Sequence, residues 1–127
     1  MAKAQRVFKS SGFAKNARKA KISDDELCEA FAEIVNGQCD DLGGGVFKKR
    51  LNKNMHRGII LAEGKMYWVY EYLFAKKDCD NIDVKELAAF RELAKAYAKV
   101  KDGQLKRLLN DHDLVEICYD SETKVQK

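Results

Sequence analysis

The sequence of 127 residues has no proline, only two histidines and no long apolar run. No stretch approaches the roughly 18 apolar residues of a membrane-spanning helix, so no contact with a membrane interior is expected. The basic N-terminus lacks the apolar core of about 7–15 residues that marks a signal peptide, and we therefore expect a cytoplasmic protein. Hydrophobic residues make up 46% and charged residues 35%, which is typical of a globular domain and not of a disordered chain.

Cysteine spacing excludes the common zinc motifs. The four cysteines, Cys28, Cys39, Cys79 and Cys118, form no C-x-x-C pair, and no histidine stands near enough to complete a ligand set. We therefore expect no metal site. A cytosolic setting disfavours disulfides, so reduced thiols are expected, some of them buried, although the spacing alone leaves pairing open.

Acidic residues are missing from two segments of the chain. Residues 1–23 hold seven cations, and residues 42–62 hold five cations and a histidine. If the fold brings these segments together, they form a positive surface that attracts a phosphate backbone. For residues 1–23, lysines scattered over a solvated surface are an equally good interpretation. The candidate RNA-binding residues of this segment are Lys15, Arg18 and Lys19.

Capping residues and apolar spacing predict four helices. Ser23 and Glu26 form an S-x-x-E capping box that opens one helix, and Asp83 opens another in the same way. The other two predicted helices cover residues 12–21 and 104–111.

Alternating, β-branched and aromatic residues predict five strands, over residues 6–9, 46–51, 56–62, 66–76 and 114–118. The middle three are joined by short connections and form an antiparallel meander. A turn at Asp40-Asp41 is expected before them. Gly43 to Gly45 then allow a sharp turn or a close approach to another segment, and they match no phosphate-binding loop.

Three consecutive cations stand in the predicted strand 46–51. Because side chains alternate between faces, Lys49 shares a face with the apolar Phe47, which we expect to point at helices. Lys49 is then expected near an edge, and Lys48 and Arg50 lie together on the open face.

An antiparallel meander brings the end of its first strand, the start of its second and the end of its third to one end of the sheet. The two outward cations of strand 46–51 therefore converge with Arg57 and Lys76. Tyr70 and Tyr72 share a strand face with Lys76 and are expected to stack on bases. The candidate catalytic residues are Lys48, Arg50, Arg57 and Lys76, and the further RNA-binding candidates are Lys49, His56, Tyr72 and Lys77.

A cationic cluster on a sheet face is costly unless an anion meets it, and an RNA phosphate is a suitable partner. Cleavage beside a 2′-hydroxyl needs removal of its proton, charge stabilisation at phosphorus and protonation of the leaving oxygen. Crowding by cations favours a neutral lysine, which makes Lys48 or Lys76 the candidate base, while arginine stays charged and suits phosphate binding. His56 is either the acid or an ordinary strand-edge residue. The reaction needs no metal or cofactor, and a merely solubilising surface is the alternative.

The chain resembles toxins of the RelE/ParE superfamily from type II toxin–antitoxin modules, within the RelE- and HigB-like branch. Two motifs, DLGGGV-x-K-x-R at residues 41–50 and the later FAKKDCDNI at residues 74–82, form together and in this order a specific signature that neither forms alone. The resemblance runs from about residue 6 to about residue 118. Its main segments are 6–19, 22–51, 72–83 and 85–94.

The resemblance implies an α+β, RelE-like fold, with two N-terminal helices packed on a curved antiparallel sheet of three to five strands and a C-terminal helix. Residues 1–120 would form one toxin domain and residues 121–127 a polar tail. It also implies a metal-independent endoribonuclease that cleaves mRNA in the ribosomal A site and inhibits translation. The partners would be the ribosome, mRNA and a cognate helix-turn-helix antitoxin, whose complex with the toxin represses its operon at operator DNA.

The basic residues that match the superfamily are Lys48, Arg50, Arg57 and Lys76. Relatives usually have a longer, glycine-rich loop where this chain has LNKNM, and often a tyrosine at His56. They often carry an arginine near Cys79, and an apolar residue at Glu71. Two other functions are open: a ParE-like, non-nuclease toxin acting on a protein such as gyrase, and an inactive relative that only binds its antitoxin.

Overall fold

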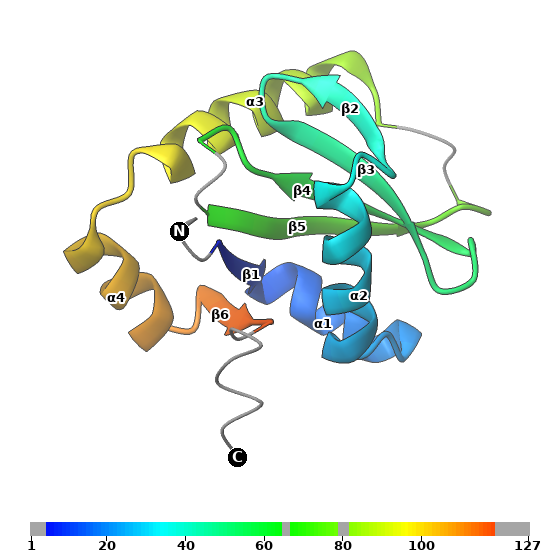
Figure 1. Cartoon of the computed structure of the whole chain (residues 1–127), viewed down its shortest axis with the longest axis horizontal. Helices are drawn as coiled ribbons and strands as arrows, with labels where there is room; N and C mark the ends of the chain where they lie inside the picture. The colour runs from blue at the N-terminus through cyan, green and yellow to red at the C-terminus, as the bar shows by residue number, and fades with distance from the viewer. Residues whose placement is uncertain (1–4, 65–66, 79–81, 119–127) are drawn as a thin grey trace.

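The computed structural model describes residues 5–64, 67–78 and 82–118, and shows one sheet with helices on both faces (Figure 1). The strands are β1 (Arg6–Ser10), β2 (Asp40–Gly43), β3 (Val46–Leu51), β4 (His56–Leu61), β5 (Tyr67–Ala75) and β6 (Leu114–Ile117). The helices are α1 (Ser11–Ala20), α2 (Asp24–Val35), α3 (Val84–Ala98) and α4 (Asp102–Asn110). The predictions for Met66, Cys79 and the tail 121–127 fall outside the described residues.

The sheet confirms the predicted α+β class and the central antiparallel meander. Its strand order is β2-β3-β4-β5-β1-β6, so it has six strands where three to five were expected. The sheet is also mixed, because β1 pairs in parallel with β5 and antiparallel with β6. The N-terminal strand thus fills the place between the meander and the last strand.

The predicted turn at Asp40-Asp41 is wrong, because these residues begin the edge strand β2. Asp40 pairs with Lys48 of β3, and the turn itself lies further on, at the glycines. An acid opposite a lysine on a neighbouring strand is a favourable cross-strand pair. That pairing offsets the poor strand propensity of aspartate.

Side-chain capping begins three of the helices. Ser23 accepts a hydrogen bond from the Glu26 amide at the start of α2, and Asp83 forms a reciprocal capping box with Glu86 at the start of α3. Ser10 caps α1 in the same way. The predicted starts of α2 and α3 are therefore confirmed.

Helices α1 and α2 cover one face of the sheet. Phe13 of α1 and Leu27 of α2 are fully buried in a core that includes Phe47 of β3 and Tyr70 of β5. Phe47 points at the helices as predicted. This core fixes α2 alongside β3. Helix α2 thereby contacts both β3 and the loop between β3 and β4.

Helices α3 and α4 cover the opposite face, which was expected to be open. Val46 is fully buried in a cluster with Ile59 and Ala94 of α3. Phe8 and Leu105 of α4 form a neighbouring cluster. The prediction of an open face is therefore wrong at the Val46 end of β3, and applies only to the residues nearer its C-terminal end.

The turn between β2 and β3 depends on glycine. Gly45 has a φ of +82°, and a Cβ atom there would lie 2.4 Å from the Cα atom of Glu63. At Gly44 a Cβ atom would lie 2.7 Å from Cγ of Arg91, which crosses over the turn from α3. The Arg91 guanidinium donates hydrogen bonds to the carbonyls of Leu42 and Gly43. Glycine thus allows the close approach that the sequence suggested.

A disulfide joins Cys28 of α2 to Cys118, just after β6, with the Cα atoms 5.2 Å apart. The expectation of reduced thiols is therefore wrong for this pair. The two cysteines are 90 residues apart, and only the return of the chain as β6 beside β1 brings them together. Cys39 has a free thiol.

No helix among the described residues is long and apolar enough to cross a membrane.

Candidate functional site

Two arginines face each other at one end of the sheet. In the β3–β4 pairing Arg50 lies directly opposite Arg57, and in the β4–β5 pairing Arg57 lies opposite Phe74. Directly opposed residues of antiparallel strands point to the same face, and like charges in that arrangement destabilise the sheet. An anion bound between the two guanidinium groups would offset this repulsion.

Arg57 is anchored as well as charged. It is only 8% exposed, and its Nη1 atom donates hydrogen bonds to the carbonyls of Asn54, at 3.0 Å, and His56, at 3.2 Å. These two bonds fix the guanidinium at the base of the β3–β4 connection. A charged group with a fixed position is suited to stabilising charge that develops on a bound phosphate.

Lys48 and Lys76 extend this row on the same face. Lys48 is two residues before Arg50, and its ammonium lies 3.6 Å from the Asp40 carboxylate, with 14% of the side chain exposed. Lys76 follows Phe74 by two residues and is exposed. The structure thus brings the four predicted catalytic residues to one face at one end of the sheet, which we call the cationic row (Lys48, Arg50, Arg57 and Lys76).

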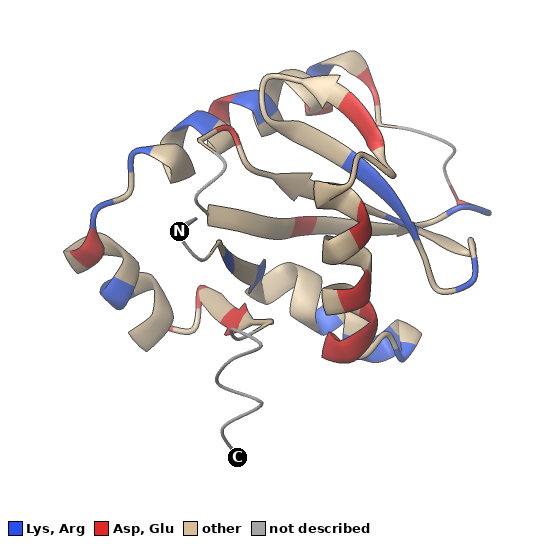
Figure 2. Cartoon of the chain, viewed as in Figure 1, with Lys and Arg blue, Asp and Glu red and all other residues tan. Residues whose placement is uncertain are grey.

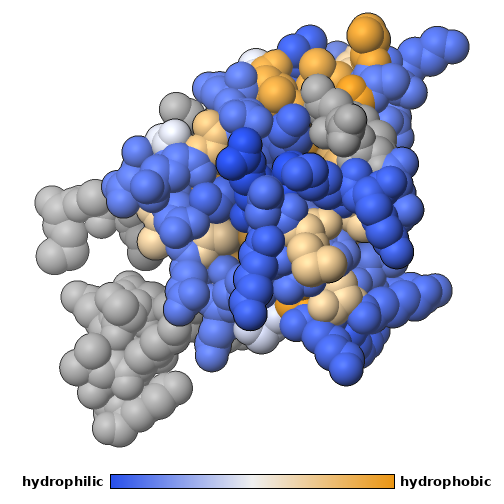
Figure 3. Space-filling view, turned by 90° about the vertical axis from the view of Figure 1, so that its right-hand side faces the viewer, coloured by the Kyte–Doolittle hydropathy of each residue, from blue (hydrophilic) through white to orange (hydrophobic). Residues whose placement is uncertain are grey.

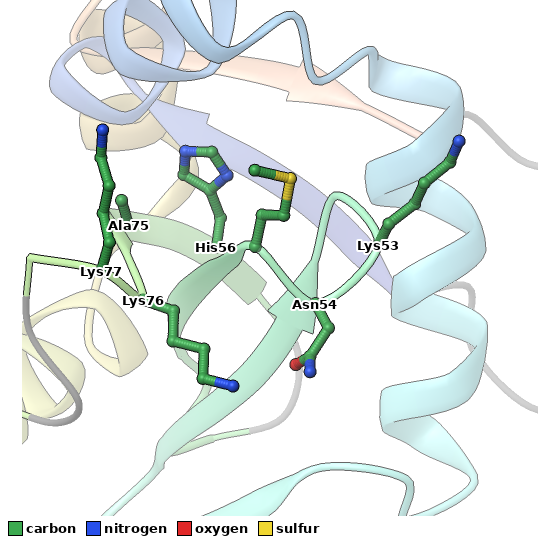
Figure 4. A pocket seen from close by; sticks show the side chains of 7 residues that line it. Lys53, Asn54, His56, Ala75, Lys76 and Lys77 are labelled. Atoms are coloured by element: carbon green, nitrogen blue, oxygen red, sulfur yellow. The ribbon is translucent and has the colours of Figure 1, made fainter.

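Other predicted RNA-binding residues lie on the opposite face. The Lys49 ammonium is 2.7 Å from the Glu33 carboxylate of α2 and donates a hydrogen bond to the carbonyl of Gln38. Figure 4 shows His56 and Lys77 directed to one side of the strand ends and Lys76 to the other. The His56 ring is thus directed away from the side to which Lys76 points, although both residues line one pocket.

His56 instead lies near α1. A pocket of about 570 Å³ is lined by His56 and by Asn16 and Lys19 of α1. Lys15, Arg18 and Lys19 are exposed on α1, and Figure 2 shows α1 beside helix α2, much of which is acidic. The structure thus separates the basic N-terminal segment from the cationic row, instead of merging the two into one continuous surface.

Tyr70 is fully buried, so the expectation that it shares an exposed face with Tyr72 is wrong. A register shift in the β4–β5 pairing places Tyr70 opposite Ile60 and Tyr72 opposite Ile59, with Glu71 as the extra residue. The Tyr70 hydroxyl donates to the Leu27 carbonyl at 2.6 Å, and burial raises the pKa of that hydroxyl. The β-bulge thus turns one tyrosine towards α2.

Tyr72 is half-buried on the face of the cationic row. Its ring packs against Phe74, at a centroid distance of 5.6 Å, and against Phe90 of α3, at 5.8 Å. This packing links the strand that leads to Lys76 with the helix that covers the rest of the face.

A second pocket, of about 710 Å³, lies at the end of the sheet and was not predicted. Its lining residues are Lys53, Asn54, Met55, His56, Ala75, Lys76 and Lys77 (Figure 4). The sequence signal that was available is the asparagine-rich loop itself, because asparagine tolerates positive φ. We call this cavity the loop pocket.

Among residues 5–64, 67–78 and 82–118, no group of three or more histidine, cysteine, aspartate or glutamate side chains is placed to hold a metal ion.

Comparison with known families decides the classification. The model described as "RelE toxin of RelE / RelB toxin-antitoxin system" matches residues 5–117. The chain belongs to the RelE toxin family. This match confirms the predicted resemblance, and it spans every strand and helix from β1 to β6. A search of curated proteins finds no match.

For a RelE-family toxin, the match implies a cognate antitoxin as partner, and toxins of this family are generally endoribonucleases. The structure shows where two residues that depart from the superfamily pattern lie in this toxin. His56 stands on the face of α1, and Glu71 occupies the bulge of β5. A third, at Cys79, falls outside the described residues.

Proposed function

We propose that this RelE-family toxin is a metal-independent, ribosome-dependent mRNA endonuclease that inhibits translation in the cytoplasm. The observation that carries the proposal is the direct opposition of Arg50 and Arg57, with Lys48 and Lys76 on the same face. A site of four cations with one anchored arginine suits a phosphate whose negative charge increases during cleavage.

In this proposal the two arginines bind the scissile phosphate and stabilise the charge that develops on it. One of the two lysines removes the proton of the 2′-hydroxyl, and the other protonates the leaving oxygen. Arg57 acts from a fixed position because its Nη1 atom is bonded to the loop carbonyls. His56 is not used as the acid, since it lies on the other face (Figure 4).

The proposed partners follow the HigB-like branch of the superfamily. They are the ribosome with its mRNA, and a helix-turn-helix antitoxin that neutralises the toxin. The toxin–antitoxin complex would bind operator DNA through the antitoxin and repress its own synthesis. We take residues 1–120 as the single toxin domain in all of these interactions.

Induced expression in a bacterium, followed by mapping of mRNA 5′ ends, tests the proposal. The wild type is compared with a Lys48→Ala/Arg57→Ala double variant and with Lys95→Ala as a control. Lys95 also carries a cation with an acidic neighbour, Glu92, but lies on the outer surface of α3. We expect new cuts at codon boundaries of translated messages with the wild type and Lys95→Ala, and none with the double variant.

Two outcomes contradict the proposal. Growth arrest without cuts would favour a ParE-like toxin that acts on a protein target such as gyrase. No arrest by a folded wild type would indicate a relative that only binds its antitoxin. Circular dichroism and thermal unfolding of the double variant would show whether lost cleavage reflects lost folding.

A further inference from the structure

The connection between β3 and β4 has an unusual backbone. Asn52, Lys53 and Asn54 have φ values of 55°, 54° and 73°, so three successive non-glycine residues lie in the left-handed region. Residues other than glycine disfavour this region, and they keep it where the surrounding structure fixes them. Glu26 of α2 supplies part of that fixation, because its carboxylate accepts a hydrogen bond from the Asn52 amide.

Two further hydrogen bonds hold the loop from the sheet side. Arg57 donates to the Asn54 carbonyl, and the Lys76 amide donates to the Met55 carbonyl at 2.9 Å. The loop is thus bound to α2, to β4 and to the end of β5. Met55 is nevertheless 63% exposed, so a rigid loop presents a large apolar side chain to solvent.

Met55 belongs to the loop pocket, which is lined by both apolar and basic side chains. Its lining includes the apolar side chains of Met55 and Ala75 together with Lys53, Lys76 and Lys77, and Figure 4 shows Lys53 directed away from Met55. No acid lines it. Figure 4 shows Lys76 and Lys77 directed to opposite sides, and Figure 3, which faces this end, shows small apolar areas within a hydrophilic surface.

We propose that the loop pocket binds one nucleobase of single-stranded RNA, with Met55 as the contact that determines which nucleotide is held beside the cationic row. The proposal rests on the proposed function and specifies which part of the RNA the toxin binds beside the scissile phosphate. A thioether makes favourable contacts with aromatic rings, and proteins that recognise unpaired RNA splay out its bases and hold them singly.

The charges around the pocket fit a nucleotide chain. Successive phosphates would meet Lys76 and Lys77 on the two sides of the pocket, while the base enters between them. Arg57 holds the loop through Asn54 and also lies in the cationic row, so base binding and phosphate binding share one anchored residue. A pocket of about 710 Å³ is within the usual range for small-ligand sites, about 300–1,000 Å³.

Binding of RNA that cannot be cleaved tests this proposal separately from catalysis. The probe is a short, fluorescent 2′-O-methyl RNA, compared with copies in which one nucleotide at a time is abasic. For the wild type we expect loss of one particular base to weaken binding about 2- to 10-fold, the range of a sulfur–aromatic contact. Met55→Ala should bind the intact RNA as weakly as the wild type binds that abasic copy, and Met55→Leu should retain most of the affinity.

Val84→Ala is the matched control, because Val84 is an apolar side chain that is 83% exposed at the start of α3, outside the loop pocket. It should bind the intact RNA like the wild type.

Three results would overturn the proposal. They are equal affinity of Met55→Ala and the wild type for intact RNA, binding that does not depend on any single base, and no binding at all. Loss of antitoxin-peptide binding in Met55→Ala, with RNA binding unchanged, would assign the pocket to the antitoxin instead. Base-dependent binding without cuts in cells would contradict the nuclease and leave the base pocket supported.

Discussion

Replacement of Gly45 by alanine tests whether the β2–β3 turn is held by a close backbone contact. Gly45 has a φ of +82°, and an added Cβ atom would lie 2.4 Å from the Cα atom of Glu63. That contact is with backbone, so a side-chain rotation cannot relieve it. The Gly45 carbonyl also accepts a hydrogen bond of 2.8 Å from the Ala62 amide, which the displacement would lengthen or break.

Gly37 provides a matched comparison. Its φ is +87°, almost the same as that of Gly45, yet an added Cβ atom would meet nothing within 4 Å. Gly37→Ala should therefore cost only the left-handed strain, about 1–2 kcal/mol of the free energy of unfolding. Gly45→Ala adds overpacking of about 1–3 kcal/mol and a weakened hydrogen bond of about 1 kcal/mol.

We therefore expect Gly45→Ala to lose about 2–4 kcal/mol more than Gly37→Ala, a large fraction of the roughly 5–15 kcal/mol that stabilises a typical domain. Urea titration followed by circular dichroism measures both losses on the purified toxin. Equal losses would refute the reasoning, because they would mean that the turn does not depend on its approach to Glu63.

Three further predictions concern the crosslink, a buried acid and the anchored arginine. Reducing the Cys28–Cys118 bond, which closes a loop of 90 residues, should lower the free energy of unfolding by about 2–5 kcal/mol. A Cys28→Ser variant as stable as the reduced wild type would confirm that the loss comes from the crosslink. Equal stability with and without reductant would contradict the prediction. Burial raises the pKa of the Glu71 carboxyl, which accepts a hydrogen bond from the Tyr97 hydroxyl. A raised carboxyl pKa means that stability is greatest below the unfolded pKa, about 4.3, and falls as the pH rises through the folded pKa. Glu71→Gln keeps a hydrogen-bond acceptor and should be more stable than the wild type at neutral pH. In denaturant titrations this difference in the free energy of unfolding should shrink below about pH 4. A difference that is the same at every pH would argue against titration of Glu71. Arg57→Lys keeps a charge but loses the Nη1 hydrogen bonds to the loop, so the rate of mRNA cleavage should fall about 100- to 1,000-fold. Cleavage by this variant at the rate of the wild type would mean that the anchored guanidinium is not needed.

Local signals in the sequence were sufficient for the helix starts and the meander. Ser23 and Asp83 are capping residues whose effect depends on neighbours three positions away, so the sequence contains the whole interaction. The alternation of strand 46–51 likewise predicts that Phe47 and Lys49 share a face, which in the structure is the face covered by α1 and α2. The separation of Lys48 and Arg50 from Lys49 follows from the same two-residue period.

Non-local pairing explains the wrong predictions. The Tyr70 side chain points inward because of a bulge at Glu71, which depends on the register with β4 and leaves no periodic trace in β5. Asp40 joins a strand because Lys48 lies opposite it, and Cys28 meets its partner only after β6 has returned to the sheet. The loop pocket combines two segments about twenty residues apart, which local patterns do not bring together.

The three consecutive cations of β3 have three different environments, and this difference explains their order. Lys49 is ion-paired with Glu33 and fixes α2 to the strand. Lys48 lies near Asp40, which the glycine turn places opposite it. Arg50 is exposed, and within the described part of the chain it has no acidic partner and lies directly across from a second arginine. Opposed like charges destabilise a sheet, so an anion bound at Arg50 would offset a repulsion that Lys48 and Lys49, each beside an acid, do not meet.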